Sequence, residues 1–352
     1  MQFDGDRRRF LTTAAMTVAA AHIDVPAAAQ SGDRVSRELA AIGRATEWIN
    51  SPRLTAATLR GKVVLVDFWT YTCINWLRTL PYVRAWSQKY QQALVVIGVH
   101  TPEFPFEHDL ANVRRSIAQL RLAHPVVIDN DYSIWRAFTN QYWPARYLLD
   151  AHGRIRHQKF GEGEYVQSEL AIQKVLAETG VAATGGTVAV AGSGLEAAAD
   201  WSSLRTPETY LGYGRTENFT SRVAAALDRR RSYVAPARLA LNQWSLNGEW
   251  TMGAVATTVN RPGGQIAFRF HARDVHLVMG PARRGDSIRF RLTIDGVAPG
   301  AAHGLDVDDA GHGIASEQRL YQLVRQPGPI VDRTLIIEYL DAGAEAFSFT
   351  FG

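Results

Sequence analysis

The run Val63–Trp69 (VVLVDFW) restricts the fold of this chain more than any other segment. Every residue in it except Asp67 is apolar, which is typical of a strand that is covered on both faces. Further strand-like runs follow at 94–99, 126–129 and 146–150. Apolar residues recur at helical spacing between these runs, and a last helical pattern ends at Gly180. This alternation predicts an α/β domain with a mixed sheet.

Beyond residue 200 the pattern changes, and apolar residues alternate with polar or small ones. The alternating segments are 266–270, 275–279, 288–294, 335–339 and 347–351. Several short alternating strands separated by turns predict an antiparallel β-sandwich or jelly roll. Residues 181–200 lack aromatic side chains and are rich in Gly and Ala, so they are predicted to be a linker. The expected division is an α/β domain at 30–180 and an all-β domain at 201–352.

The first residues have the features of an export signal. Arg7-Arg8-Arg9 precede the mostly apolar run 11–21, and small residues follow at Ala27–Ala29. We interpret residues 1–29 as a twin-arginine-type signal peptide, which predicts a periplasmic or secreted protein. The run is too short to span a bilayer and no other apolar stretch is long enough, so no membrane span is expected in the mature protein.

Composition excludes some classes of partner. The 352 residues are 46% hydrophobic and 20% charged, which is ordinary for a globular protein of about two domains. The net charge is only +4, and the basic residues beyond the N-terminus are scattered along the sequence. A nucleic-acid partner is therefore not expected.

Cys73 is the only cysteine of the chain. No internal disulfide can form, although an oxidising compartment favours disulfides, so the fold must be held by core packing. The thiol can pair only with another molecule.

The segment Val64–Pro81 resembles the active-site segment of thioredoxin-fold proteins. Asp67 lies six residues before Cys73, where thioredoxins carry a buried carboxylate that serves proton transfer. Pro81 lies eight residues after Cys73, where they carry a helix proline. Trp143-Pro144 is similar to the cis-proline loop of the family.

Other segments resemble the secreted TlpA-like and AhpC/TSA-like redoxins that carry a DipZ-type C-terminal β-sandwich. These segments are 98–104, 159–163, 206–212 and 319–324. The resemblance implies a thioredoxin fold followed by a β-sandwich that is similar to carbohydrate-binding modules. It also implies thiol–disulfide oxidoreductase activity, with a protein disulfide or a small-molecule thiol as the reaction partner.

The sequence departs from the family at Trp76, because the family pattern is Cys-x-x-Cys and this chain has Cys73-Ile74-Asn75-Trp76. The resemblance assigns the attacking thiol to Cys73 and supporting roles to Asp67 and Pro144, but it supplies no resolving cysteine. The predicted substrate-binding residues are Trp69, Trp76 and Trp143. No metal site and no cofactor are expected.

The position of Cys73 at the start of a helix is expected to favour the thiolate, because helix amides and the helix dipole stabilise negative charge. Cys73 can then attack a disulfide, while an outside thiol releases the product. The alternatives are a one-cysteine thiol peroxidase, which forms a sulfenic acid, and a binding protein whose buried cysteine does no redox chemistry. Whether Trp76 covers the sulfur decides between reactive and inert.

The second domain offers weaker signals. Its aromatic side chains could stack on a glycan or another cell-envelope partner, but most are predicted to lie in the core; they are Trp201, Tyr210, Tyr213, Trp244 and Trp250. Residues 306–317 are similar to a calcium loop, but Ala310 stands where a ligand is needed. His100, His108 and His124 lack ligand spacing and are expected at the surface or in loops.

Overall fold

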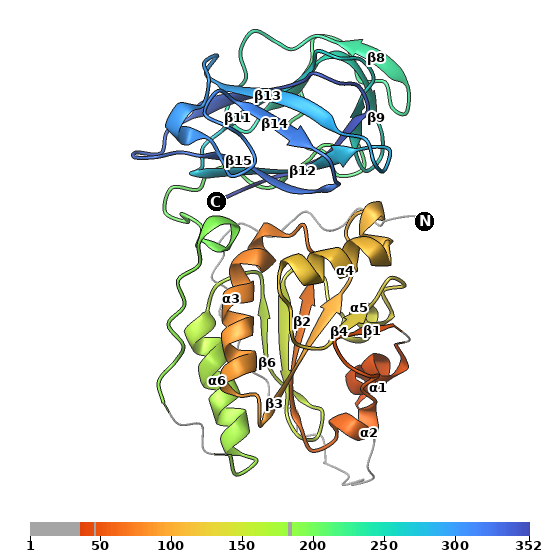
Figure 1. The fold of residues 1–352 in the computed structure, drawn as a ribbon, viewed down its shortest axis with the longest axis vertical. Helices are drawn as coiled ribbons and strands as arrows, with labels where there is room; N and C mark the ends of the chain where they lie inside the picture. Colours follow the sequence, from red (N-terminus) through yellow and green to blue (C-terminus); the bar gives the residue numbers. More distant parts are fainter. Residues whose placement is uncertain (1–35, 46, 182–184) are drawn as a thin grey trace, which may run out of the picture. The chain divides into compact units, whose positions relative to one another are not determined.

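The computed structural model describes residues 36–45, 47–181 and 185–352 (Figure 1). The predicted signal peptide at 1–29 lies outside the described residues. Within the described part, all of which belongs to one compact unit, none of the helices has the length and apolar character needed to cross a bilayer.

The first half of the chain builds a six-stranded mixed sheet in the order β1-β4-β3-β2-β5-β6. Strands β2, β3 and β4 are parallel, and the other neighbours are antiparallel. The strands are β1 (Trp48–Ile49), β2 (Val63–Trp69), β3 (Leu94–His100), β4 (Val126–Ile128), β5 (Ala145–Leu149) and β6 (Ile155–Phe160). The predicted mixed sheet is confirmed.

Helices cover both faces of this sheet, as the apolar run in β2 requires. They are α1 (Arg37–Arg44), α2 (Ala56–Leu59), α3 (Ile74–Lys89), α4 (Leu110–Gln119), α5 (Ser133–Ala137) and α6 (Tyr165–Ala177), with a 3-10 helix at Pro105–His108. Val63 and Leu65 pack with α3 and α6, whereas Val64 and Val66 pack with α1, α2 and α5. Successive residues of a strand point to opposite faces, so a strand between two helical layers must be apolar throughout.

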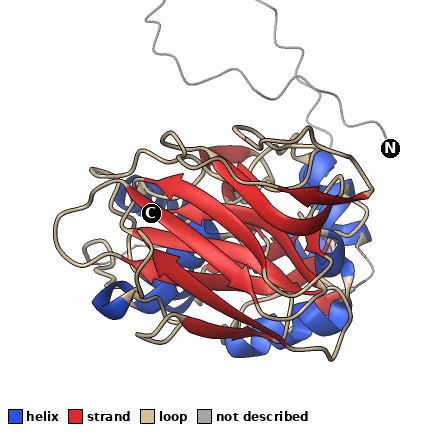
Figure 2. Cartoon of the chain, turned by 90° about the horizontal axis from the view of Figure 1, so that it is seen from above, coloured by secondary structure: helices blue, strands red, loops and turns tan. Residues whose placement is uncertain are grey.

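The second half of the chain forms an eleven-stranded sheet in which the named strands pair antiparallel (Figures 1 and 2). The strands are β7 (Thr209–Tyr210), β8 (Arg230–Tyr233), β9 (Trp244–Met252), β10 (Thr257–Val259), β11 (Gly264–Phe270), β12 (Asp274–Pro281), β13 (Ile288–Ile294), β14 (His312–Ala315), β15 (Arg319–Arg325), β16 (Arg333–Tyr339) and β17 (Ala344–Phe351). Figure 2 shows these strands side by side as a curved sheet. This architecture agrees with the predicted sandwich.

Strand β9 joins the two halves of this sheet. Its residues Trp244–Asn247 pair with β11, and its residues from Gly248 onward pair with β8 and β10. Gly248 has φ of 92°, and a Cβ there would lie 3.1 Å from Cα of Gly264. A side chain is therefore disfavoured at this change of partner.

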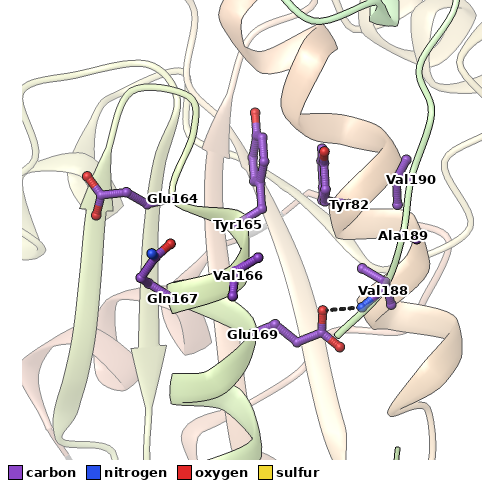
Figure 3. A pocket seen from close by; sticks show the side chains of 9 residues that line it. All are labelled: Tyr82, Glu164, Tyr165, Val166, Gln167, Glu169, Val188, Ala189 and Val190. Atoms are coloured by element: carbon purple, nitrogen blue, oxygen red, sulfur yellow. Dashed lines mark hydrogen bonds between the residues drawn. The ribbon is translucent and has the colours of Figure 1, made fainter. Parts of the chain in front are cut away.

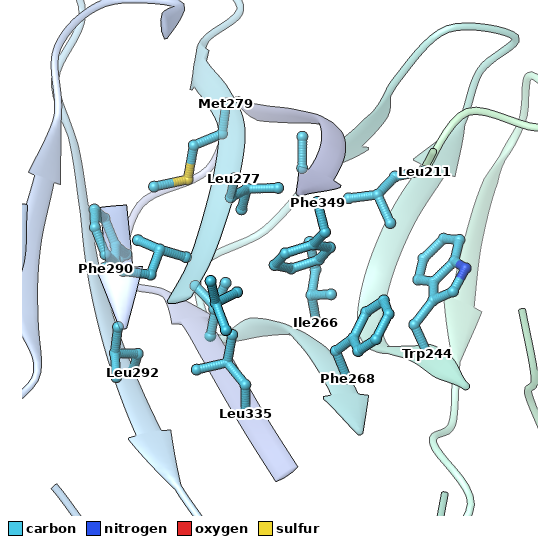
Figure 4. Packing of buried hydrophobic residues seen from close by; sticks show 14 of the residues in the cluster. Leu211, Trp244, Ile266, Phe268, Leu277, Met279, Phe290, Leu292, Leu335 and Phe349 are labelled. Atoms are coloured by element: carbon cyan, nitrogen blue, oxygen red, sulfur yellow. The ribbon is translucent and has the colours of Figure 1, made fainter. Parts of the chain in front are cut away.

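The core of the second half comes from alternating residues of facing strands (Figure 4). Ile266 and Phe268 of β11 point toward Leu277 of β12 and Phe349 of β17 in this cluster. Trp244 and Trp250 are fully buried, as predicted, whereas Trp201 is 60% exposed. Asp306 does not form a calcium loop, because its carboxylate accepts hydrogen bonds from Arg319 and from the Gln322 amide.

The described part of the linker, 185–200, is held against the first half of the chain. The Val188 amide donates a 2.7 Å hydrogen bond to Glu169 of α6, and Arg84 of α3 pairs with Glu196 at 2.7 Å. Figure 3 shows this segment beside a shallow groove in which the rings of Tyr82 and Tyr165 stack at 3.6 Å. The linker therefore has fixed contacts on α3 and α6.

Candidate thiol site

Cys73 lies at the junction between β2 and α3 and is the residue that caps α3. Its carbonyl accepts the amides of Trp76 and Leu77 at 3.1 and 3.0 Å, which starts the helix. The side chain is half-buried and packs against an apolar cluster. Cys73 therefore occupies the predicted strand-to-helix junction, and the residue is not completely buried.

Trp76, at the position of the missing cysteine, is fully buried. Its indole Nε1 donates a 2.8 Å hydrogen bond to Oδ2 of Asp67. The indole also stacks on Trp69, with ring centroids 4.4 Å apart and planes inclined by 23°. These contacts direct the ring to the protein interior, and Cys73 remains partly exposed beside it.

Asp67 is fully buried on β2, opposite Arg146 of β5. Burial raises its pKa to about 6, although the hydrogen bond from Trp76 and the charge of Arg146 oppose the rise. Its second oxygen, Oδ1, has no hydrogen-bond partner among the described residues. Asp67 is therefore a carboxyl group that changes its protonation state near neutral pH.

The Trp143-Pro144 peptide bond is cis, as the resemblance implies. The indole of Trp143 donates a hydrogen bond to the carbonyl of Thr101 at 3.0 Å and packs on Trp135 with centroids 4.3 Å apart. Of the three predicted substrate-binding tryptophans, Trp143 is half-buried, whereas Trp69 and Trp76 are fully buried. In this structure only Trp143 presents surface to a substrate; the substrate-binding roles stay predictions.

The electrostatic setting of Cys73 differs from the expectation. Burial raises the pKa of the Cys73 thiol well above its ordinary value, and the charges of Glu103 and Glu208 raise it further. The backbone amides of Trp76 and Asn75 oppose this shift. The prediction that the start of the helix lowers the pKa of Cys73 was therefore wrong in direction, because desolvation of the thiolate outweighs the effect of the helix amides.

Glu103 connects the thiol site to the second half of the chain. Its Oε1 accepts hydrogen bonds from the Tyr210 hydroxyl at 2.6 Å and from Nη1 of Arg215 at 2.8 Å. The guanidinium of Arg215 also lies 3.4 Å from the centre of the Tyr210 ring. The sequence analysis missed this group, because contacts between residues about a hundred positions apart leave no local pattern.

A second carboxylate, Glu107, supports the loop that precedes Cys73. It is fully buried; Oε1 accepts from the Thr72 hydroxyl at 2.6 Å, and Oε2 accepts from the amides of Glu103 and Phe104 at 2.6 and 2.9 Å. Burial raises its pKa to about 7. Sequence reasoning missed Glu107 as well, since a single glutamate in a loop gives no signal of burial.

Two histidines near this site are buried: His124 lies in a loop, as expected, whereas His100 ends strand β3, which corrects the expectation that it lies at the surface or in a loop. His100 is fully buried and its ring lies edge-on to Trp69, with centroids 4.9 Å apart. Burial lowers the pKa of His100 to about 3 and that of His124 to about 4, so both are neutral at physiological pH. His108 is exposed, as expected.

The described residues contain no group of three or more His, Cys, Asp or Glu side chains arranged to hold a metal ion. The groups that this site brings together are the Cys73 thiol, the Asp67 carboxyl group that accepts from Trp76, and the charges of Glu103 and Glu208 that act on the thiol.

Comparison with known proteins agrees with this geometry. The family described as "Thioredoxin like C-terminal domain" matches residues 206–352. Protein DipZ of Mycobacterium tuberculosis is 38% identical over 240 residues, which are 67% of this chain and 34% of DipZ. The chain thus spans about a third of the length of that relative.

A smaller relative is matched over most of its length. Thiol-disulfide oxidoreductase YkuV of Bacillus subtilis is 30% identical over 132 residues, which are 38% of this chain and 89% of YkuV. A solution structure of a thioredoxin-like protein in the oxidized form is 32% identical and covers 38% of this chain and 90% of its own, with a TM-score of 0.35.

The chain belongs to the thioredoxin-like family of thiol–disulfide oxidoreductases. Its residues 206–352 match the thioredoxin-like C-terminal domain, and over 240 residues it is similar to DipZ.

Proposed function

We propose that this protein is a monothiol member of its family and exchanges disulfides through Cys73. The Cys73 thiolate attacks one sulfur of a substrate disulfide, so that a mixed disulfide forms and the other substrate sulfur leaves as a thiolate. An external thiol, after losing its proton, then attacks the mixed disulfide and releases Cys73 as a thiolate. Electrons balance, because the external thiol is oxidised as the substrate is reduced.

The observation that carries this proposal is the partly exposed Cys73 beside a buried Trp76. Since the indole is held by Asp67 and Trp69, an incoming disulfide does not have to displace it. The cis bond before Pro144 supports the proposal, because that loop borders the thiol in the family. Asp67 and Pro144 are the proposed supporting residues.

The second candidate is a binding protein without redox chemistry, and the raised pKa of Cys73 favours it. A thiol with a high pKa is mostly protonated at neutral pH and reacts slowly. A one-cysteine thiol peroxidase, in which peroxide oxidises Cys73 to a sulfenic acid, is disfavoured for the same reason.

Reaction of the native protein with a chromogenic aromatic disulfide separates these candidates. We expect one mixed disulfide per chain, absent in Cys73→Ser, and its release by added glutathione. Reaction only after denaturation would contradict the redox proposal. Peroxidase activity is tested separately, by trapping a sulfenic acid with a dimedone probe.

The remaining assignments are proposals that rest on the sequence. We infer export through the twin-arginine-type signal at 1–29, with a domain at 30–180, a linker at 181–200 and a β-sandwich at 201–352. The exposed Trp201 supports a glycan or cell-envelope partner for the β-sandwich. Fractionation of cells that express the full chain, with and without Arg7→Lys/Arg8→Lys, tests export.

A further inference from the structure

A cluster of arginines lies around strand β8 of the second half of the chain. Between residues 222 and 238 there are five arginines and a single acidic residue, Asp228. All five arginine side chains are exposed; they are Arg222, Arg229, Arg230, Arg231 and Arg238. The expectation that the basic residues beyond the N-terminus are scattered is therefore wrong for this segment.

Most of these charges have no local counter-charge. Arg230 lies 3.9 Å from Glu249. The other four make no ion pair and no side-chain hydrogen bond to another described residue. Asp228 accepts the Tyr213 hydroxyl at 2.8 Å and forms no ion pair with these arginines, and its single negative charge is outnumbered by their five positive charges.

Elsewhere in the same domain the usual arrangement is different. Arg289 pairs with Asp341 at 2.8 Å, Arg319 with Asp306 at 2.6 Å and Arg325 with Asp274 at 2.6 Å. The segment around β8 is thus a region of uncompensated positive charge in a domain whose arginines are otherwise commonly paired.

Exposed apolar side chains lie within the same region. Leu227 is 49% exposed, Val234 43% and Val255 43%. Leu227 lies beside Met252 at the end of β9, and Val255 belongs to the turn that follows β9, so both are close to β8 in the sheet. Strand β8 itself pairs only with β9 among the described strands, so its other edge has no strand partner, and the preceding segment contacts only its end, where the Arg222 amide donates to the Val234 carbonyl at 3.0 Å.

We propose that this β8 edge is a docking surface for an anionic phospholipid membrane. Unpaired arginines attract anionic headgroups, and apolar side chains between them can enter the boundary between headgroups and acyl chains. The arginines are spread over residues 222–238, which suits an extended surface. This inference is independent of the chemistry of Cys73.

The alternative is that the arginines only keep other strands from the open edge of β8, as charged edge residues do in many sheets. That role predicts no binding to lipid. It also does not account for the exposed Leu227 and Val255 beside the charges.

Co-sedimentation of the full-length protein with vesicles tests the proposal. We expect binding to vesicles of equimolar phosphatidylglycerol and phosphatidylcholine, which weakens with added salt, and little binding to phosphatidylcholine alone. Arg222→Gln/Arg229→Gln/Arg231→Gln should weaken binding roughly a hundredfold, because each arginine near a membrane contributes about a factor of five.

A matched control removes the same charge at other exposed arginines. Arg121, Arg205 and Arg283 are exposed and make no ion pair with a described residue, so their triple replacement by Gln should leave binding unchanged. An equal loss of vesicle binding in both triple variants would overturn the proposal of a specific surface at β8, because net charge alone would then account for the binding.

Two further outcomes overturn the lipid assignment. The first is the absence of binding to the anionic vesicles. The second combines two results: dextran sulfate binds tightly with the same dependence on the arginines, and Leu227→Ser has no effect on vesicle binding. Together these results would identify a general polyanion site. Retained circular dichroism and thermal unfolding of each variant show that a loss does not come from misfolding.

Discussion

The indole Nε1 of Trp76 donates a 2.8 Å hydrogen bond to Oδ2 of Asp67, so the residue at the position of the resolving cysteine has become the partner of the buried acid. The resemblance to thioredoxins implies that an acid at this position serves proton transfer. Here it holds a tryptophan that stacks on Trp69 and packs below Cys73. One hydrogen bond therefore joins the residue at the position of the missing thiol to the buried acid.

The first prediction concerns stability and pH. Burial raises the pKa of Asp67 from 3.8 to about 6, so the folded protein binds more protons than the unfolded chain between these values. Stability from this group therefore falls as pH rises from about 4 to about 6, by about 3 kcal/mol in total. The free energy of unfolding of Asp67→Asn, measured with urea across this pH interval, should therefore fall less steeply with pH than that of the unchanged protein.

Because Asn keeps an acceptor for the Trp76 indole, the variant isolates the charge from the hydrogen bond. Asp131→Asn is a suitable control, since Asp131 is an exposed carboxylate whose pKa is lowered by the Ser133 amide. An unchanged slope in Asp67→Asn would show that Asp67 is ionised over the whole range.

The second prediction concerns the reactivity of Cys73. Burial is the largest cause of its raised pKa, and the negative charge of Glu103 adds to it. Glu103→Gln removes that charge and should speed the reaction with iodoacetamide at mildly alkaline pH a few-fold, with the midpoint of the rate profile at lower pH. The profile is measured by mass spectrometry of the labelled protein.

Arg215 should act in the opposite direction. Its guanidinium lies 2.8 Å from Oε1 of Glu103, so Arg215→Gln leaves the carboxylate less compensated and slows labelling of Cys73. Arg284→Gln, which removes an exposed arginine 3.3 Å from Asp109, should have no effect. Equal rates in the Arg215 and Arg284 variants would show that the β-sandwich does not tune the thiol.

Comparison of sequence and structure explains which features could be predicted. The central strand β2 could be predicted, because a strand that is covered on both faces has an almost entirely apolar sequence. The short helices α2 and α5, of 4 and 5 residues, were missed, since they contain too few turns to show helical spacing.

At the site, the resemblance to thioredoxin-fold proteins predicted where Cys73, Asp67 and the cis Trp143-Pro144 bond lie. It did not predict the direction of the thiol pKa, because desolvation depends on side chains brought from the rest of the fold. Glu103 and its partner Arg215 belong to the same class of long-range contact.

The third prediction concerns Glu107, which accepts hydrogen bonds from Thr72 and from two backbone amides. In Glu107→Gln one of these donors loses its acceptor, which should cost about 1–3 kcal/mol in free energy of unfolding. The variant should also reduce the part of the pH dependence that extends to about pH 7, to which Glu107, Glu162 and Glu208 all contribute through raised pKa values. A loss of stability with an unchanged pH dependence would contradict the assigned titration.

The last prediction restores the missing cysteine. Trp76→Cys should give an intramolecular disulfide with Cys73, since the family places both cysteines at this spacing, and disulfide reductase activity toward insulin should appear. Removing a fully buried indole should also cost about 3–5 kcal/mol of stability, and Asp67 loses its hydrogen bond. Trp76→Ala is the matched control, because it creates a similar cavity without a thiol. If both variants remain folded at low temperature and neither reduces insulin, the deficit lies beyond the resolving position, in the acidic and buried setting of Cys73.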